Sequence, residues 1–323
     1  MQRRNFLQLA ATGAAGLALR CGAAAGEAGA DREPVLDAHI HLFDPTRPGG
    51  VPWPTPDDII YKPALPDRYA ALSAPFGVRG AMAIEASPLA TDNDWLLGVA
   101  ERHPLIVGII GDLVPSDPGF RGALERLHAN ALFRGIRYGN LWNHDLSVDQ
   151  HKAGFVEGVR ELAAAGLVFE SANPDPRLIR ALRELGERVP DVTIVIDHLP
   201  HGPVPTEATA RVAYEADLSA LAERPRVFVK LSEIPVLADG KLITDMGYYR
   251  AALDALWNTF GEDRVLFGSD WPNSDHVAPY AETFRLVRAY MAEKTPRARA
   301  KYYWHNSIAA YHWRPRRADQ RMA

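Results

Sequence analysis

Short apolar stretches alternate with amphipathic ones from residue 35 onward, and this alternation limits the folds open to the chain. The strand-like stretches are 35–41, 78–86, 105–112, 133–138, 166–171, 192–198, 226–232 and 264–270. The helix-like stretches are 67–74, 91–102, 117–129, 149–164, 175–188, 207–223, 247–260 and 275–293, followed by 296–311. Strict alternation requires parallel strands, and eight repeats close most readily into a barrel. The prediction is an α/β fold, a (β/α)8 TIM barrel in a single domain over residues 31–323.

An open, doubly wound parallel sheet is the alternative architecture. That fold needs a glycine-rich turn after the first strand to approach a phosphate. Residues Leu42 to Pro45 occupy this place and include no glycine. The proline-rich stretch 42–66 is therefore predicted to be a long loop, and its Trp53 and Tyr61 either wall a pocket or pack on the barrel rim.

Ionisable residues gather at the C-terminal ends of the predicted strands. They are His39, His41, Glu85, Arg137, Glu170, Asp197, His198, Lys230 and Asp270. In a barrel these strand ends share one face, whereas strand interiors should be apolar. This distribution predicts a site for a small-molecule substrate at that face.

The first strand ends in two histidines one residue apart. Because side chains alternate along a strand, Asp37, His39 and His41 are expected to point the same way. Two imidazoles at this spacing could hold a metal ion or the oxyanion of a substrate, although such a pair is weak evidence alone. Asp270, which follows Gly268 and Ser269 at the last strand end, could ligate a metal, accept a proton or simply cap a helix.

Four further residues are candidates with open alternatives. Arg137 could grip a carboxylate or carbonyl with its forked guanidinium. Lys230 is flanked by apolar residues and needs a partner or a pocket, which favours contact with substrate. Glu85 could bind substrate or pair with a basic neighbour, and His198 is either catalytic or a core histidine bonded to Asp197.

Five motifs in this order resemble the amidohydrolase-related family, and its lactonase branch in particular. They are Asp37-Ala38-His39-Ile40-His41, Arg134-Gly135-Ile136-Arg137, Ile196-Asp197-His198, Val229-Lys230-Leu231-Ser232 and Gly268-Ser269-Asp270-Trp271-Pro272. That branch includes sugar-acid lactonases and pyrone-dicarboxylate or muconolactone hydrolases. The resemblance implies a TIM barrel with His39, His41 and Asp270 at its centre and His198 beside them. It further implies that Arg137 or Lys230 holds the carbonyl or acid group of the substrate.

The same three central residues could bind a metal. His39, His41 and Asp270 supply two nitrogen donors and one oxygen donor, a mixture that suits one zinc-like divalent ion. The wider superfamily usually adds a lysine or glutamate from the fourth strand and a histidine from the fifth, but this chain has Arg137 and Glu170 there. We therefore expect at most one divalent ion, and basic side chains could stabilise an oxyanion without it.

The predicted activity is hydrolysis of a lactone or related cyclic ester of a small organic or sugar acid. Asp270 would activate water, and His198 would donate a proton to the departing alkoxide. One alternative is a metal-dependent decarboxylase, which the missing fifth-strand histidine disfavours. The other is an exported protein that binds a small acid without turnover.

The N-terminal thirty residues resemble a twin-arginine export signal. Arg3 and Arg4 precede Phe6-Leu7 and a mildly apolar run that is too short to span a bilayer permanently. We expect residues 1–30 to be a cleaved signal peptide, leaving a periplasmic or secreted protein without a membrane anchor. Lipidation at Cys21 is the alternative, although Arg20 takes the place where lipoproteins carry a small residue. The formal charge of −4 gives no reason to expect nucleic acid as a partner, and the oligomeric state is open.

Overall fold

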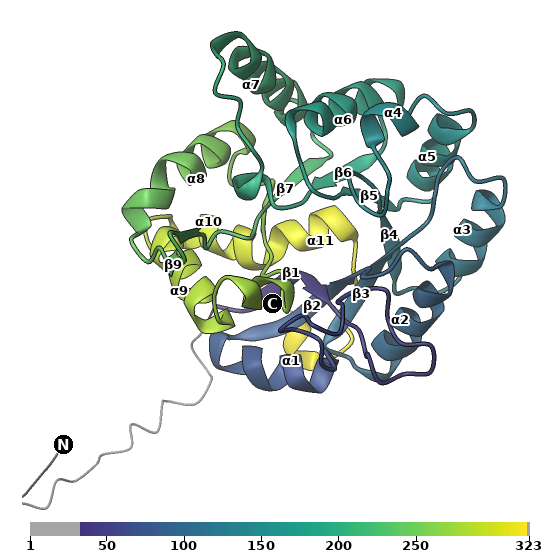
Figure 1. The fold of residues 1–323 in the computed structure, drawn as a ribbon, viewed down its shortest axis with the longest axis horizontal. Helices are drawn as coiled ribbons and strands as arrows, with labels where there is room; N and C mark the ends of the chain where they lie inside the picture. Colours follow the sequence, from purple (N-terminus) through teal and green to yellow (C-terminus); the bar gives the residue numbers. More distant parts are fainter. Residues whose placement is uncertain (1–32, 322–323) are drawn as a thin grey trace, which may run out of the picture. The chain divides into compact units, whose positions relative to one another are not determined.

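A parallel eight-stranded sheet curls into a barrel at the centre of the computed structural model, which describes residues 33–321 (Figure 1). Its strands, in spatial order, are β1 Val35–His41, β2 Val78–Ile84, β3 Ile106–Gly111, β4 Phe133–Arg137, β5 Val168–Ser171, β6 Thr193–Ile196, β7 Val227–Leu231 and β10 Val265–Phe267. The segment after β10 joins β1, because Asp270 N donates to His39 O and His41 N to Trp271 O, over 2.9 and 2.7 Å. The predicted TIM barrel is confirmed.

Helices surround this barrel in the order that the alternation predicts (Figure 1). The principal ones are α1 Pro66–Ser73, α2 Ala90–Arg102, α3 Phe120–His128, α5 Phe155–Ala164, α6 Pro176–Arg188, α7 Ala208–Ala222, α8 Met246–Phe260 and α9 Tyr280–Met291. Helix α6 illustrates why they form. Its N-cap Asp175 accepts a hydrogen bond from Leu178 N at 2.8 Å, Pro176 begins the first turn, and Leu178, Leu182 and Leu185 form a buried stripe.

Two predicted helix boundaries are wrong. The stretch 149–164 is not one helix, because the short helix α4 (Leu146–Asp149) ends first and Gly154 then takes φ +81° before α5. The stretch 275–293 becomes helical only at Tyr280, after the 3-10 turn η3 (Asn273–His276) and Pro279. Outside the barrel, a small antiparallel hairpin, β8 Leu237–Ala238 with β9 Lys241–Leu242, was not predicted.

The predicted helical stretch 296–311 closes the far end of the barrel. It consists of α10 Pro296–Ala300, a π-helical turn η4 Lys301–His305 and α11 Asn306–Tyr311. Trp304, Tyr311 and Trp313 are buried in one apolar cluster with the inward-facing residues Leu36 and Ala38 of β1. The C-terminal segment therefore fills the end of the barrel interior beneath the histidines.

The side-chain alternation of β1 breaks between Asp37 and Ile40. The pairing of β1 with β2 has an irregular register between Asp37 and Ile40. Asp37 therefore does not share a face with the histidines as expected. Its carboxylate instead accepts hydrogen bonds from Tyr69 OH at 2.6 Å and from Ser269 N at 2.8 Å, between the barrel and α1.

No helix within residues 33–321 combines the length and the apolar character that crossing a bilayer requires. The predicted signal peptide, residues 1–30, and the predicted lipidation alternative at Cys21 lie outside the described residues.

Candidate active site

A cavity of about 200 Å³ opens at the C-terminal ends of the strands. It is lined by His41, Trp53, Ala86, Arg137, Leu141, Trp142, Asn173, His198, Glu233, Asp270 and Asn273. Four of the predicted site residues, His41, Arg137, His198 and Asp270, thus meet at one surface. His39 lies next to them but is fully buried.

Three potential ligand atoms converge at the floor of this cavity. His39 Nε2 lies 3.2 Å from His41 Nε2, while Asp270 Oδ1 lies 3.1 Å from His41 Nε2 and 3.5 Å from His39 Nε2. Ligands about 2.0–2.1 Å from a tetrahedral ion are about 3.3 Å apart, so these separations match three corners of such a site. Gly268 permits this approach, because a Cβ there would lie 2.9 Å from His39 Cβ.

The charges around the three histidines also suit a cation. The buried ionisable residues here are Arg137, Lys230, Glu85, Glu170, Asp197 and Asp270. With every carboxylate ionised, four negative charges face two positive ones in a desolvated region. One divalent ion would neutralise that excess, so both the donor atoms and the charge fit a single ion.

Burial keeps the imidazoles neutral. It lowers the pKa of His41 to about 4 and lowers the pKa values of His39 and His198 well below the usual range. His41 Nδ1 faces two carbonyl oxygens, Ile84 O at 3.2 Å and Glu85 O at 3.1 Å. Because carbonyls only accept, Nδ1 carries the proton and Nε2 presents a lone pair toward Asp270.

Asp270 is held by one carboxylate oxygen and free at the other. Asn273 Nδ2 donates to Asp270 Oδ2 at 2.7 Å, whereas Oδ1 is buried and accepts no hydrogen bond from the described residues. Burial raises the pKa of Asp270 to about 6. An ionised carboxylate with a free buried oxygen can take a proton or ligate a cation. His198 Nε2 lies 3.8 Å from that oxygen, and its Nδ1 contacts Ser232 Oγ at 2.8 Å.

Lys230 lies behind His39 and does not line the cavity, contrary to the predicted contact with substrate. It is fully buried, and its Nζ lies 2.6 Å from Glu170 Oε1, 2.9 Å from Asp197 Oδ1 and 3.0 Å from His39 Nδ1. Tyr311 OH donates to the other oxygen of Glu170 at 2.7 Å. Both carboxylates offset the desolvation of the ammonium. Because an ammonium only donates, His39 Nε2 is free to ligate a metal only when the His39 proton lies on Nδ1, toward Asp197 Oδ1 at 3.4 Å, rather than when Nδ1 accepts from Lys230.

Glu85 also lies outside the main cavity, as the partner of Arg137 rather than as the predicted substrate ligand. Its Oε1 accepts from Arg137 Nε at 2.7 Å, and its Oε2 accepts from Trp142 Nε1 and Ser87 N, both at 3.0 Å. These bonds orient Arg137 toward the cavity. The structure therefore agrees with the alternative prediction, that Glu85 pairs with a basic neighbour.

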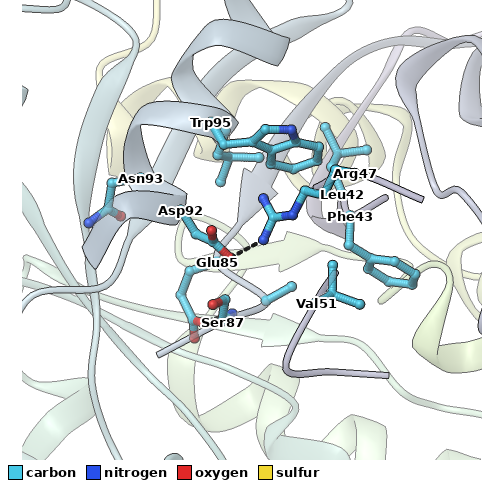
Figure 2. A pocket seen from close by; sticks show the side chains of 11 residues that line it. Leu42, Phe43, Arg47, Val51, Glu85, Ser87, Asp92, Asn93 and Trp95 are labelled. Carbon is cyan, nitrogen blue, oxygen red and sulfur yellow. Dashed lines mark hydrogen bonds and ion pairs between the residues drawn. The ribbon is translucent and has the colours of Figure 1, made fainter. Parts of the chain in front are cut away.

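Figure 2 shows Glu85 among the residues lining a smaller adjoining pocket. There Arg47, in the proline-rich loop, donates to Asp92 Oδ2 at 2.6 Å and its guanidinium lies 4.8 Å from the centre of the Trp95 ring. This contact fixes the loop to α2. The same loop supplies Trp53, whose ring centre lies 5.8 Å from that of His41, so the loop walls the cavity.

Several residues that line the cavity were not predicted from the sequence. An unusual backbone conformation distinguishes some of them. Five non-glycine residues of the cavity have positive φ: Trp142, Asn173, His198, Glu233 and Asp270. Such conformations are uncommon and concentrate at functional sites. Asn173 and Glu233 each lie two residues beyond a strand, after Ser171 and Leu231, and could have been suggested from the sequence, whereas no such signal marks Trp142.

Comparisons with known proteins agree with this architecture. The model of the amidohydrolase family matches residues 36–313. The L-fucono-1,5-lactonase of Burkholderia ambifaria is 32% identical over 246 residues, 74% of this chain and 80% of that protein. The L-fucono-1,5-lactonase of Burkholderia multivorans is 27% identical over 301 residues, 89% of this chain and 98% of that protein.

Solved structures show the same fold. A zinc-bound amidohydrolase from Burkholderia multivorans superposes with a TM-score of 0.74 at 23% identity, covering 87% of this chain and 100% of that chain. Amidohydrolase 2 from Bifidobacterium longum subsp. infantis gives a TM-score of 0.67 at 25% identity, covering 87% and 99%. With a family match across almost the whole barrel, the chain belongs to the amidohydrolase family and is a hydrolase.

Proposed function

We propose that this protein hydrolyses the lactone of a small polyhydroxylated acid. The observation that carries the proposal is Asp270, which lines the cavity with His41 and Arg137 and whose buried Oδ1 has no hydrogen-bond partner among the described residues. Two similar proteins are named L-fucono-1,5-lactonases, which supports a lactone as the substrate class.

The cavity walls favour a neutral lactone over one that carries free carboxylates. Among the described residues, Arg137 is the only arginine or lysine in the lining, and Glu85 already pairs with it. Asp270 and Glu233 add carboxyl groups, whose side chains hydrogen-bond each other. The amides of Asn173 and Asn273 can hydrogen-bond hydroxyl groups, and a tryptophan ring gives an apolar surface for the C–H face of a sugar-like ring.

Arg137, Asp270 and His198 would have different roles in lactone hydrolysis. Arg137 would polarise the lactone carbonyl, and Asp270 Oδ1 would take a proton from a water molecule as its oxygen attacks the carbonyl carbon. When the ring C–O bond breaks, that proton would pass from Asp270 to the departing alkoxide. The neutral His198, 3.8 Å from Asp270, would hydrogen-bond the alkoxide and relay the proton.

We propose further that His39, His41 and Asp270 hold at most one divalent ion. Such an ion would act as a Lewis acid toward the carbonyl oxygen and add to the stabilisation of the oxyanion. The matching donor separations and the excess of buried carboxylates support this proposal.

Acid release from a lactone panel tests the function. Titration of full-length protein on 1,4- and 1,5-lactones of aldonic acids, with and without chelator, should show hydrolysis that the Asp270→Asn variant lacks. Measuring the carbon dioxide released from the corresponding acids and from aromatic acids distinguishes lactonase activity from decarboxylase activity. Carbon dioxide without lactone hydrolysis would overturn the proposal.

We also propose that residues 1–30 direct twin-arginine export. The paired Arg3 and Arg4 followed by Phe6-Leu7 support this. Cell fractionation should find the wild-type chain in the periplasm or medium, and a variant with both arginines replaced by lysine should stay in the cytoplasm. Unchanged export of that variant would contradict the proposal.

A further inference from the structure

A second cavity adjoins the candidate active site. It also has a volume of about 200 Å³, and it is lined by Glu233, Pro235, Asn273, Ser274, His276 and Val277. Glu233 and Asn273 line both cavities. At roughly 30 Å³ per water molecule, each cavity has the space of six or seven waters, which suits one ring-sized group.

The two cavities share two lining residues. Asn273 Nδ2 donates to Glu233 Oε1 at 3.2 Å and to Asp270 Oδ2 at 2.7 Å. Glu233 and Asn273 are both only half-buried. Because the same two half-buried residues line both spaces, a substrate that extends from the carbonyl beside Asp270 would contact this pair where it enters the second cavity.

The second cavity offers polar and apolar contacts together. Ser274 is 6% exposed, and its Oγ is buried without a hydrogen-bond partner among the described residues. Buried hydroxyls are normally satisfied, so rotation of this side chain toward the cavity would give the hydroxyl a partner in a bound ligand. Pro235 and Val277 add apolar surface, and the Glu233 carboxylate adds an acceptor. A hydroxylated ring has the matching combination of O–H groups and C–H faces.

We propose that the second cavity binds a glycosyl substituent of the lactone, so that lactones of disaccharide acids are substrates. This inference rests on the proposed function for the reaction itself. Glu233 and Asn273 would then lie between the lactone ring and the glycosyl ring. Ser274 would hydrogen-bond the glycosyl ring.

The comparison of D-glucono-1,5-lactone with cellobiono-1,5-lactone tests this proposal, with spontaneous hydrolysis subtracted. We expect kcat/KM about fivefold higher for the disaccharide lactone, the effect of roughly one additional neutral hydrogen bond. Ser274→Ala, which loses the hydroxyl, and Val277→Phe, which fills the cavity, should each remove this preference. The matched control Val212→Phe, at a position 67% exposed on α7, should keep the wild-type ratio. A preference for the monosaccharide lactone, or a preference that Val277→Phe leaves intact, would overturn the proposal.

A binding measurement separates this inference from the proposed function. Isothermal titration calorimetry with gluconate and cellobionate measures the binding of the two acids and does not require turnover. If neither lactone is hydrolysed, the proposed function fails for this ring class, yet tighter binding of cellobionate by the wild type than by Val277→Phe would still support the second cavity. Equal binding of the two acids by the wild type would overturn the inference whatever the hydrolysis assay shows.

Discussion

His41 Nε2 lies 3.1 Å from Asp270 Oδ1, a buried carboxylate oxygen that accepts no hydrogen bond from the described residues. A buried acceptor without a partner among the described residues costs free energy, so we expect a water molecule, a cation or the substrate to complete its contacts. The other oxygen of Asp270 is fixed by Asn273, so Oδ1 has a defined direction toward His39 and His41.

Replacing Asp270 by asparagine should remove the base while preserving its shape. We expect kcat/KM on the preferred lactone to fall by about 10³-fold, the size of effect typical for loss of a general base. Thermal melting should show that the variant folds. Asp94→Asn, at an exposed aspartate, is the matched control. Full activity of Asp270→Asn would show that another group activates water.

The dependence of kcat/KM on pH should report the same carboxylate. Burial raises the pKa of Asp270 to about 6, and only the ionised form can accept a proton. We therefore expect kcat/KM of chelator-treated protein to rise with pH up to about 6 and then level off. Asn273→Ala removes a hydrogen bond that favours the carboxylate, so its acid limb should move to higher pH. An acid limb near pH 4 in the chelator-treated wild type would contradict this prediction.

The strand ends were predictable, but the contacts between them were not. The alternation of elements and the barrel rule brought His39, His41, His198 and Asp270 together correctly, because strand-end position follows from topology. The prediction that Asp37 points to the same side as the histidines was wrong. A register irregularity in β1, which the local sequence does not indicate, turns its side chain to the other face.

Pairing partners also depend on tertiary distances. Lys230 and Glu85 were expected to meet substrate, yet each has partners on other strands that offset its burial: Glu170 and Asp197 for Lys230, and Arg137 for Glu85. The sequence shows that a buried charge needs a partner but does not identify it. A wall residue such as Trp142 comes from an irregular loop, where neither periodicity nor topology places a side chain.

Elemental analysis should find no more than one divalent ion per chain. The possible ligand groups overlap, because His39–Asp197–His198 and His198–Glu233–Asp270 each share a residue with His39–His41–Asp270. Lys230 and Arg137 also lie beside Asp197, where their positive charges disfavour a second ion. Where an ion is bound, chelation should lower Tm, because ligands that bind only the folded state stabilise it. His41→Ala should lose the ion. Two equivalents of metal in the wild type would contradict the prediction.

Replacing Lys230 by methionine should destabilise the barrel strongly. Glu170 and Asp197 would both lose their shared buried partner, and breaking such a pair typically costs about 3–5 kcal/mol. Urea unfolding at pH 7 measures the loss, with Lys62→Met at an exposed lysine as the control. The added substitution Glu170→Gln should recover part of the stability by removing one unpaired charge. Equal stability of Lys230→Met and the wild type would show that the network contributes nothing.

Asp112 lies just after β3, and ionisation of its buried carboxyl group should destabilise the fold at alkaline pH. It is 7% exposed, and burial, with a smaller contribution from Glu85, raises its pKa to about 7 from the usual 3.8. The folded state therefore holds this proton more tightly than the unfolded chain does. The resulting stabilisation is fully present below about pH 4 and is lost as the pH rises through about 7.

Asp112→Asn should therefore become more stable than the wild type as the pH rises. Asparagine cannot ionise, and the side chain of Asn93 bonds only the backbone of Asp112, at 2.8 and 2.9 Å, so that contact survives the substitution. A shift of about three pKa units sets an upper limit of about 4 kcal/mol, and we expect about half of it at pH 8 because the loop can relax toward water. Urea unfolding at pH 5 and pH 8 measures the effect, with Asp94→Asn as the control. A stability difference that is the same at both pH values would show that Asp112 is ionised throughout.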